Sequence, residues 1–170
     1  MDVAVLAERV LEQGSPQHGA LVFYTSAAAC HKCHAEGEES SPLGPDLATI
    51  GREVTSEQVI DSILRPSRTI RKGYETVTLL TSDGKIFAGL VASDDEDQIV
   101  LRDAANLEEE INIKQSDIEE RVIAKKSMMP LGLVSSLRSE QQFYDLARYV
   151  IEVAHGGPVR AAQLKPRPED

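Results

Sequence analysis

Large aromatic side chains are scarce in this 170-residue chain. Phenylalanine, tyrosine and tryptophan together make up 4% of the residues, and tryptophan is absent. Aromatic rings supply much of the bulk of an ordinary protein core, so this chain has few large side chains with which to fill one. A bulky apolar prosthetic group would help to fill such a core.

Long apolar runs and an excess of positive charge are also missing. No stretch approaches the roughly 18 apolar residues of a membrane-spanning helix. The N-terminal apolar run covers residues 3–7 and is followed by Glu8 and Arg9, which is too short and too charged for a signal peptide. If the protein is exported, we therefore expect either that a signal has been removed from this chain or that the chain is a piece of something longer.

The charge balance indicates which partners the protein can bind. The chain has 18 basic and 28 acidic residues and a formal charge of −10. Such a chain repels phosphate backbones, so nucleic acid and anionic membranes are disfavoured. A basic protein or a neutral small molecule is favoured instead.

Helical periodicity flanks a segment with strand periodicity. Apolar spacing and capping signals predict helices over residues 2–12, from Pro16 towards residue 30, over 55–64 and over 139–155. Residues 73–123 alternate β-branched and polar positions around an Asp-Gly turn, which predicts an antiparallel β module of four or five strands. Gly156, Gly157 and Pro158 are expected to end the last helix.

These patterns predict a mainly α protein with an inserted small antiparallel β module, α+β overall. A β module between helices of one core is best explained as an insertion. The expected parts are an N-terminal helix and linker at 1–14, a first helical part at 15–72, the β module at 73–124, a second helical part at 125–156 and a flexible tail at 157–170.

The chain contains only two cysteines, Cys30 and Cys33, within the sequence Cys-His-Lys-Cys-His. A zinc site needs about four ligands, usually from two pairs of residues. No second cysteine pair follows, and His18 and His155 are the candidates to complete such a site. A redox dithiol usually begins a helix beside a βαβ pattern, whereas Cys30 follows a helical run with no strand before it.

Covalent attachment of haem is the chemistry that matches the pattern C-x-x-C-H. The thiols of Cys30 and Cys33 would add to the two vinyl groups of the porphyrin. Two intervening residues let one turn of chain span the edge of the macrocycle. His34 would then present its imidazole to the iron as an axial ligand.

A methionine is the expected second axial ligand. Haem c bound through histidine usually takes Met or His on its other side. Met128 and Met129 lie in an apolar segment without helical period, and Pro130 follows. A rigid Met-Pro segment is well suited to hold a thioether sulfur in a fixed place.

With its C-x-x-C-H motif and the later Met-Pro segment, the chain resembles the class I cytochromes c over most of its length outside residues 73–123. Gly19 and Phe23 look like the family's G-x-x-x-F pair on the N-terminal helix, and Leu146 and Tyr149 look like their packing partners on the last helix. The resemblance implies a mainly α cytochrome c fold with an inserted β module, in which Gly19 lets the last helix cross closely.

Three further positions take a role from this resemblance. The sequence Gly44-Pro45-Asp46-Leu47 is similar to the family's G-P-x-L segment. The carbonyl of Pro45 would accept the Nδ1 proton of His34, which fixes the ring and tunes the iron. Leu47 would line the haem, and Arg52 resembles the family's arginine near a haem propionate.

The number of residues between the two expected iron ligands points to a narrower group within the family. The family ligand commonly precedes a proline, which implies Met129 rather than Met128. Met129 follows His34 by 95 residues (129 − 34), which is long for a small class I cytochrome, and the β module accounts for the excess. This layout resembles the haem-binding cytochrome c domains of planctomycetes and verrucomicrobia, which often end larger exported proteins with predicted dehydrogenase or propeller regions.

An electron-transfer protein, not an enzyme, is the function that these features predict. One covalent haem c with both axial positions filled would carry single electrons to or from a redox protein or a fused dehydrogenase domain. Because haem c is attached outside the bacterial cytoplasm, a periplasmic or other extracytoplasmic location is implied. Two alternatives stay open. One is a haem sensor or peroxidase-like enzyme with a displaceable methionine. The other is an interaction role for the β module, including a homodimer.

Overall fold

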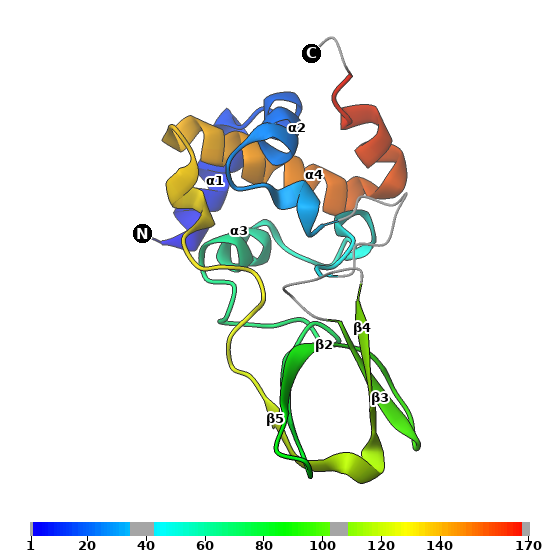
Figure 1. Cartoon of the computed structure of the whole chain (residues 1–170). Helices are drawn as coiled ribbons and strands as arrows, with labels where there is room; N and C mark the ends of the chain where they lie inside the picture. Colours follow the sequence, from blue (N-terminus) through cyan, green and yellow to red (C-terminus); the bar gives the residue numbers. More distant parts are fainter. Residues whose placement is uncertain (1, 35–42, 103–108, 168–170) are drawn as a thin grey trace. The chain divides into compact units, whose positions relative to one another are not determined.

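The computed structural model of the chain describes residues 2–34, 43–102 and 109–167. Over these residues the protein is α+β, with four α-helices and one five-stranded antiparallel sheet (Figure 1). The chain divides into two compact units, a helical unit of residues 1–65 and 131–170 and a strand unit of residues 66–130. The β module is therefore inserted between helices, as predicted. In the described part of the chain, no helix has the length and apolar character needed to span a membrane.

Side-chain caps fix where the helices of the helical unit begin. The unit contains α1 (Val3–Gln13), α2 (Pro16–Thr25), α3 (Ser56–Leu64) and α4 (Glu140–Leu164), with the 3-10 turns η1 (Cys30–Lys32), η2 (Leu47–Thr49) and η4 (Leu133–Ser136). Asp2, Ser15, Thr55 and Ser139 each accept a hydrogen bond from a backbone N–H in the first turn of their helix. The capping box of Thr55 with Gln58 is confirmed.

The core of the helical unit is organised by the crossing of α2 and α4. A Cβ added to Gly19 would clash with the backbone carbonyl of Asp145 and lie 2.7 Å from the Cβ of Tyr149. The rings of Phe23 and Tyr149 lie 5.2 Å apart and, like Leu146, are buried. The close crossing at Gly19 and its aromatic partners are as expected from the sequence.

A buried carboxylate joins the same two helices. The Asp145 side chain is 5% exposed, and its Oδ1 accepts hydrogen bonds from the Ser15 backbone N at 2.8 Å and from Gln141 Nε2 at 2.9 Å. Two donors satisfy an oxygen that would otherwise be costly to bury. The start of α2 is thereby fixed to α4.

The last helix does not end where the sequence predicts. Gly157, with φ 67° and ψ −163°, bends α4, and helix continues from Pro158 to Leu164. Ala161 and Leu164 are buried in the helical core, and Arg160 Nε donates to Glu152 Oε2 across the bend at 3.0 Å. The predicted flexible tail is thus wrong for residues 158–164, because Gly-Gly-Pro produces a kink and proline is well suited to begin the new stretch.

The strand unit forms its own small core. Its strands β1 (Thr76–Thr81), β2 (Ile86–Asp94), β3 (Gln98–Arg102), β4 (Glu110–Lys114) and β5 (Ile118–Ile123) have the order β4-β3-β2-β1-β5. The 3-10 turn η3 (Gln115–Asp117) returns the chain so that β5 pairs with β1. Alternate positions pack inside a curved sheet (Figure 1): Val77, Leu79, Ile99, Leu101 and Ile113. The sequence predicted four or five strands for this module, and the sheet has five.

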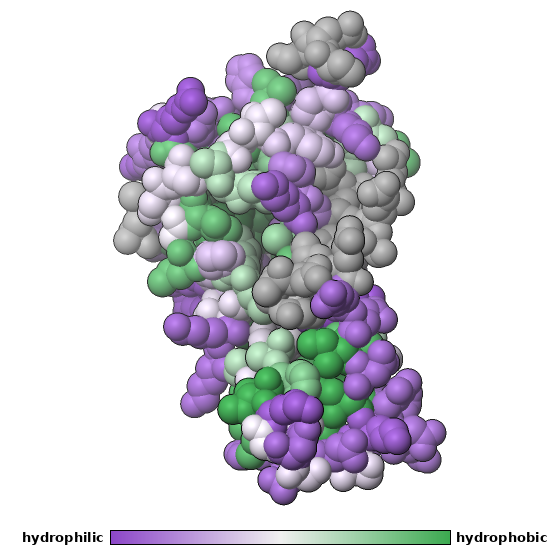
Figure 2. Space-filling view, viewed as in Figure 1, coloured by the Kyte–Doolittle hydropathy of each residue, from purple (hydrophilic) through white to green (hydrophobic). Residues whose placement is uncertain are grey.

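Part of the strand unit's surface is hydrophobic. Ile86, Val122 and Ile123 are 70%, 49% and 62% exposed, and Figure 2 shows apolar surface on this unit. Ile86 is on the opposite face of β2 from the inward-facing Phe87, because successive residues of a strand alternate between faces. The homodimer through the β module stays a prediction.

One ionic cluster ties distant parts of the sheet together. Asp94, at the end of β2, accepts from Arg121 Nη1 of β5 at 2.6 Å and from Gln115 Nε2 of η3 at 2.8 Å. The hydrogen bond from Arg121, followed by that from Gln115 and the positive charge of Arg121, lowers the pKa of Asp94, while burial opposes the shift. The charged form of Asp94 is therefore the form that stabilises this unit.

Replacing Gly19 by alanine should destabilise the helical unit. The new methyl group has no room against the Asp145 carbonyl, so α2 and α4 must separate, at a cost of about 1–3 kcal/mol in the free energy of unfolding. Denaturant unfolding measures the loss. Gln17→Ala, an exposed change on the same helix, is the control and should change stability by less than about 0.5 kcal/mol. Equal stabilities for the two variants would contradict the close crossing.

Asp94→Asn should remove an acid-sensitive part of the strand unit's stability. Because the folded pKa of Asp94 is lowered, its contribution is present above the unfolded pKa of about 3.9 and is lost as pH falls through the folded value. The side chain is 35% exposed, so we expect less than about 1 kcal/mol. Denaturant unfolding followed by NMR of strand-unit amides between pH 7 and 2 measures this. Glu119→Gln, the same charge change on an exposed position of β5, is the control and should change stability at pH 7 by less than about 0.5 kcal/mol.

Candidate functional site

A single tight turn holds the two cysteines and the histidine that follows them. Ala29 is the last residue of the short segment between α2 and η1, and its backbone is in the left-handed region with φ 50°. The backbone N–H groups of Cys33 and His34 both donate to the Cys30 carbonyl, at 3.1 and 3.0 Å. The turn therefore brings Cys30, Cys33 and His34 together on a few residues of chain, directly after α2.

The surroundings of the two thiols differ from those of a reactive dithiol. Neither cysteine forms a disulfide, and both are half-buried. Burial raises the pKa of Cys30 to about 11 and also raises the pKa of Cys33. Reactive dithiols have lowered thiol pKa values, so this environment disfavours the redox-dithiol alternative and keeps both sulfurs as neutral thiols.

His34 is held by the carbonyl that the resemblance implies. Its Nδ1 lies 3.0 Å from the Pro45 carbonyl oxygen. A carbonyl only accepts, so Nδ1 carries the proton and Nε2 keeps its lone pair. Burial lowers the pKa of His34 more than the Pro45 carbonyl raises it. The ring is therefore neutral and oriented, which is the state a metal-binding imidazole requires.

Gly44 makes room for this hydrogen bond. A Cβ at Gly44 would lie 2.7 Å from His34 Cε1 and 2.8 Å from its Nδ1. The missing side chain lets the backbone before Pro45 approach the ring. Sequence reasoning quoted Gly44 without assigning it a role, although a glycine beside the Pro45 carbonyl was a usable signal for close backbone approach.

The segment after Pro45 is fixed to the helical core. Asp46 Oδ1 accepts from the Ala48 backbone N at 2.9 Å and caps η2. Leu47 and Ala48 are buried in the cluster that contains α2 and α4 residues. Leu47 is thus in the same unit as His34, whereas Arg52 is exposed in the turn before α3, and its predicted role stays a prediction.

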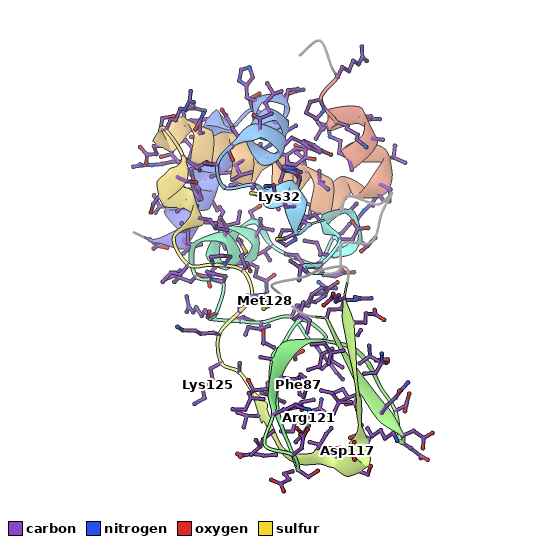
Figure 3. The ribbon with its side chains drawn as sticks, viewed as in Figure 1. Lys32, Phe87, Asp117, Arg121, Lys125 and Met128 are labelled. Atoms are coloured by element: carbon purple, nitrogen blue, oxygen red, sulfur yellow. The ribbon has the colours of Figure 1, made fainter. Side chains whose placement is uncertain are left out.

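The other histidine of the motif has different surroundings. His31 is exposed, its ring stacks on Tyr24 at 5.8 Å between centroids, and its Nδ1 lies 3.4 Å from the Phe23 carbonyl oxygen. Lys32, labelled in Figure 3, is exposed beside it. Of the two histidines, His34 is the one held in a buried, oriented position.

The two candidate methionines belong to the strand unit. Met128 (Figure 3) and Met129 are half-buried in a non-helical segment, as predicted. The Met129 backbone N donates to Ser127 Oγ at 3.1 Å, and the Ser127 backbone N donates to Ser67 Oγ at 3.1 Å. Because His34 lies in the helical unit, its pairing with Met129 on one iron stays a prediction.

The zinc alternative gains no support from the described side chains. Within residues 2–34, 43–102 and 109–167, no group of three or more His, Cys, Asp or Glu side chains could hold a metal ion. His155 is half-buried, and its Nε2 lies 2.7 Å from the Val54 carbonyl oxygen. His18 is exposed on α2. Neither histidine completes a zinc site with the cysteines.

Comparisons with protein-family models and with curated proteins found no match to this chain. The indication of function therefore comes from the residues themselves: two neutral thiols and one oriented imidazole on a single turn.

Gly44→Ala should weaken the hydrogen bond between His34 and Pro45. The added methyl group overlaps the imidazole, so the ring or the backbone must move, at a cost of about 1–3 kcal/mol in the free energy of unfolding. The NMR signal of the His34 Nδ1 proton should exchange faster with water than in the parent protein. Pro45→Ala is the matched control, because it keeps the accepting carbonyl and should keep that signal. An unchanged signal in Gly44→Ala would contradict the role of Gly44.

Proposed function

We propose that the protein is a monohaem c-type cytochrome that carries single electrons. Haem c would be attached through Cys30 and Cys33, and the iron would be bound by His34 and Met129. The observation that carries this proposal is the hydrogen bond between His34 Nδ1 and the Pro45 carbonyl. His34 lies on the same turn as both cysteines. The hydrogen bond leaves Nε2 as the donor atom at the end of a C-x-x-C-H motif.

The residues of the site fit this group. The two half-buried thiols are spaced to form thioether bonds, and neither is tied up in a disulfide. The Pro45 carbonyl orients His34, and Gly44 allows that approach. Leu47 would contribute apolar surface, Arg52 would face a propionate, and Met129 would supply the thioether sulfur. The bound haem would supply one-electron Fe(III)/Fe(II) chemistry.

The wider assignments follow from the same proposal. The helical unit would be a cytochrome c fold, supported by the close crossing of α2 and α4 at Gly19. The protein would be an electron carrier and not an enzyme, paired with a redox protein or a fused dehydrogenase domain. Haem c attachment would place it in the periplasm or another extracytoplasmic compartment.

A haem sensor or peroxidase-like enzyme is the second candidate. The observation in its favour is that Met129 lies in a non-helical segment of the strand unit, while His34 lies in the helical unit. If that segment moved away, the iron would have an open position. Binding of carbon monoxide by the untreated reduced protein distinguishes this candidate from a carrier with both positions filled.

Optical spectra of the protein, expressed in a host that matures haem c, test the proposal. We expect low-spin bands as isolated and after dithionite reduction, with no carbon monoxide binding. Met129→Leu should give a high-spin ferric spectrum, because one axial ligand is lost, whereas the matched variant Met128→Leu should stay low-spin. A high-spin parent protein would favour the second candidate, and a complete lack of haem bands would contradict both.

A further inference from the structure

A hydrogen bond and a proline restrict the backbone of Met129 on both sides. Its backbone N donates to Ser127 Oγ at 3.1 Å in a partly buried position. Pro130 follows directly, and a residue before proline is disfavoured in helical backbone conformations. A serine hydroxyl that accepts from the amide two residues later forms a local turn. The bond to Ser127 therefore distinguishes Met129 from its neighbour Met128.

Ser127 is in turn bonded to a distant residue of the same unit. Its backbone N donates to Ser67 Oγ at 3.1 Å, across 60 residues of sequence. Ser67 follows Pro66, the first residue of the strand unit, in the turn after α3. Ser67, Ser127 and Met129 are thus joined by a chain of two hydrogen bonds, which we call the serine clamp.

A second link holds the same segment against the sheet. The Ala124 backbone N donates to the Thr76 carbonyl at 2.7 Å, just after β5 and at the first residue of β1. Residues 124–127 are therefore attached at both ends, to Thr76 and to Ser67. The position of the Met129 backbone relative to the sheet depends on hydrogen bonds that lie within the strand unit.

Solvent exposure ranks the two hydrogen bonds of the serine clamp. The bond from Met129 to Ser127 is partly buried, whereas the bond from Ser127 to Ser67 is exposed. Water replaces an exposed hydrogen-bond partner at little cost, but a partly buried amide that loses its acceptor is harder to solvate. The hydroxyl of Ser127 should therefore contribute more than the hydroxyl of Ser67.

We infer that Ser127 and Ser67 are positioning residues that hold the Met129 thioether in place as the axial ligand of the proposed haem, in preference to Met128. This inference rests on the proposed function, because the serine clamp acts on iron only if haem is attached. Without the clamp, binding of the sulfur would have to order a more mobile segment. That entropy cost would weaken the bond between iron and Met129.

Exchange of backbone amides with water, measured by NMR, tests the serine clamp without any haem readout. Ser127→Ala removes the acceptor of the Met129 amide, so this amide should exchange about 3–10-fold faster than in the parent protein. Ser67→Ala should accelerate exchange of the Ser127 amide by a smaller factor. Ser127→Thr keeps a hydroxyl and should restore the slower exchange of Met129. An unchanged Met129 amide in Ser127→Ala would overturn the inference.

Competition with imidazole tests the effect of the clamp on the iron–sulfur bond. Imidazole nitrogen is a ligand of haem iron and displaces a weakly held methionine, so the optical band of the ferric iron–methionine bond is lost. In Ser127→Ala, half of the band should be lost at about 3–10-fold less imidazole, the factor that corresponds to one ordinary hydrogen bond. Ser127→Thr should match the parent. Adding Ser67→Ala to Ser127→Ala should change little, because both act through one chain of bonds.

Two further variants make the imidazole readout specific. Ser116→Ala is the matched control, because it also removes a serine hydroxyl in the strand unit, one that donates to Asp117 Oδ1 at 3.0 Å. Its imidazole affinity should stay within about twofold of the parent value. The series is repeated in the presence of Met128→Leu, which prevents Met128 from replacing Met129 at the iron.

The outcomes separate this inference from the proposed function. If Ser116→Ala favours imidazole as much as Ser127→Ala does, the cause is general destabilisation of the strand unit, and the positioning role is wrong. If Ser127→Ala binds imidazole as the parent does, the inference is overturned although haem is present. If no haem is incorporated, the proposed function fails and the ligand role of the clamp fails with it, whereas amide exchange still shows whether the clamp holds Met129.

Discussion

The close approach of α2 and α4 at Gly19 is the constraint on which the rest of the helical unit depends. It sets the direction in which α2 delivers the chain to the turn of Cys30 and His34, since only Ser26 to Ala29 intervene. The same last helix packs against η2, which carries Leu47. The crossing at Gly19 therefore positions both segments that meet at the His34 imidazole, namely the turn after α2 and the segment that leads into η2.

The site combines burial with a single directed hydrogen bond. Burial keeps His34 neutral, and the Pro45 carbonyl decides which nitrogen carries the proton. Neither effect alone would give a neutral ring with its proton on Nδ1. Burial does not select the tautomer, and at an exposed site water would compete with the carbonyl for the Nδ1 proton. Burial also raises the pKa of the neighbouring Cys30 thiol, so this thiol and the His34 imidazole share a partly buried environment, whereas His31 and Lys32 are exposed.

Local patterns predicted most of the fold, whereas the contact between His34 and the Pro45 carbonyl came from the resemblance alone. The capping box at Thr55, the strand alternation after Gly73 and the pairing of Gly19 with the last helix are all short-range or family-like signals. The helix beyond Gly157 was missed because Gly-Gly-Pro is both a stop signal and a good start for a new helical stretch. Its stability comes from burial of Ala161 and Leu164 against the core, and single-sequence periodicity does not register such tertiary burial in a short segment.

The adjacency of Thr76 and Ala124 lowers the cost of placing a sheet between two helices of one unit. The inserted sheet begins and ends at neighbouring residues and has its own core. It therefore adds no more to the entropy cost of joining α3 to α4 than a short loop would, whatever the length of the insertion. Changes within residues 76–124 therefore act first on the core of the strand unit, whereas the turn that carries Cys30, Cys33 and His34 depends on the core of the helical unit.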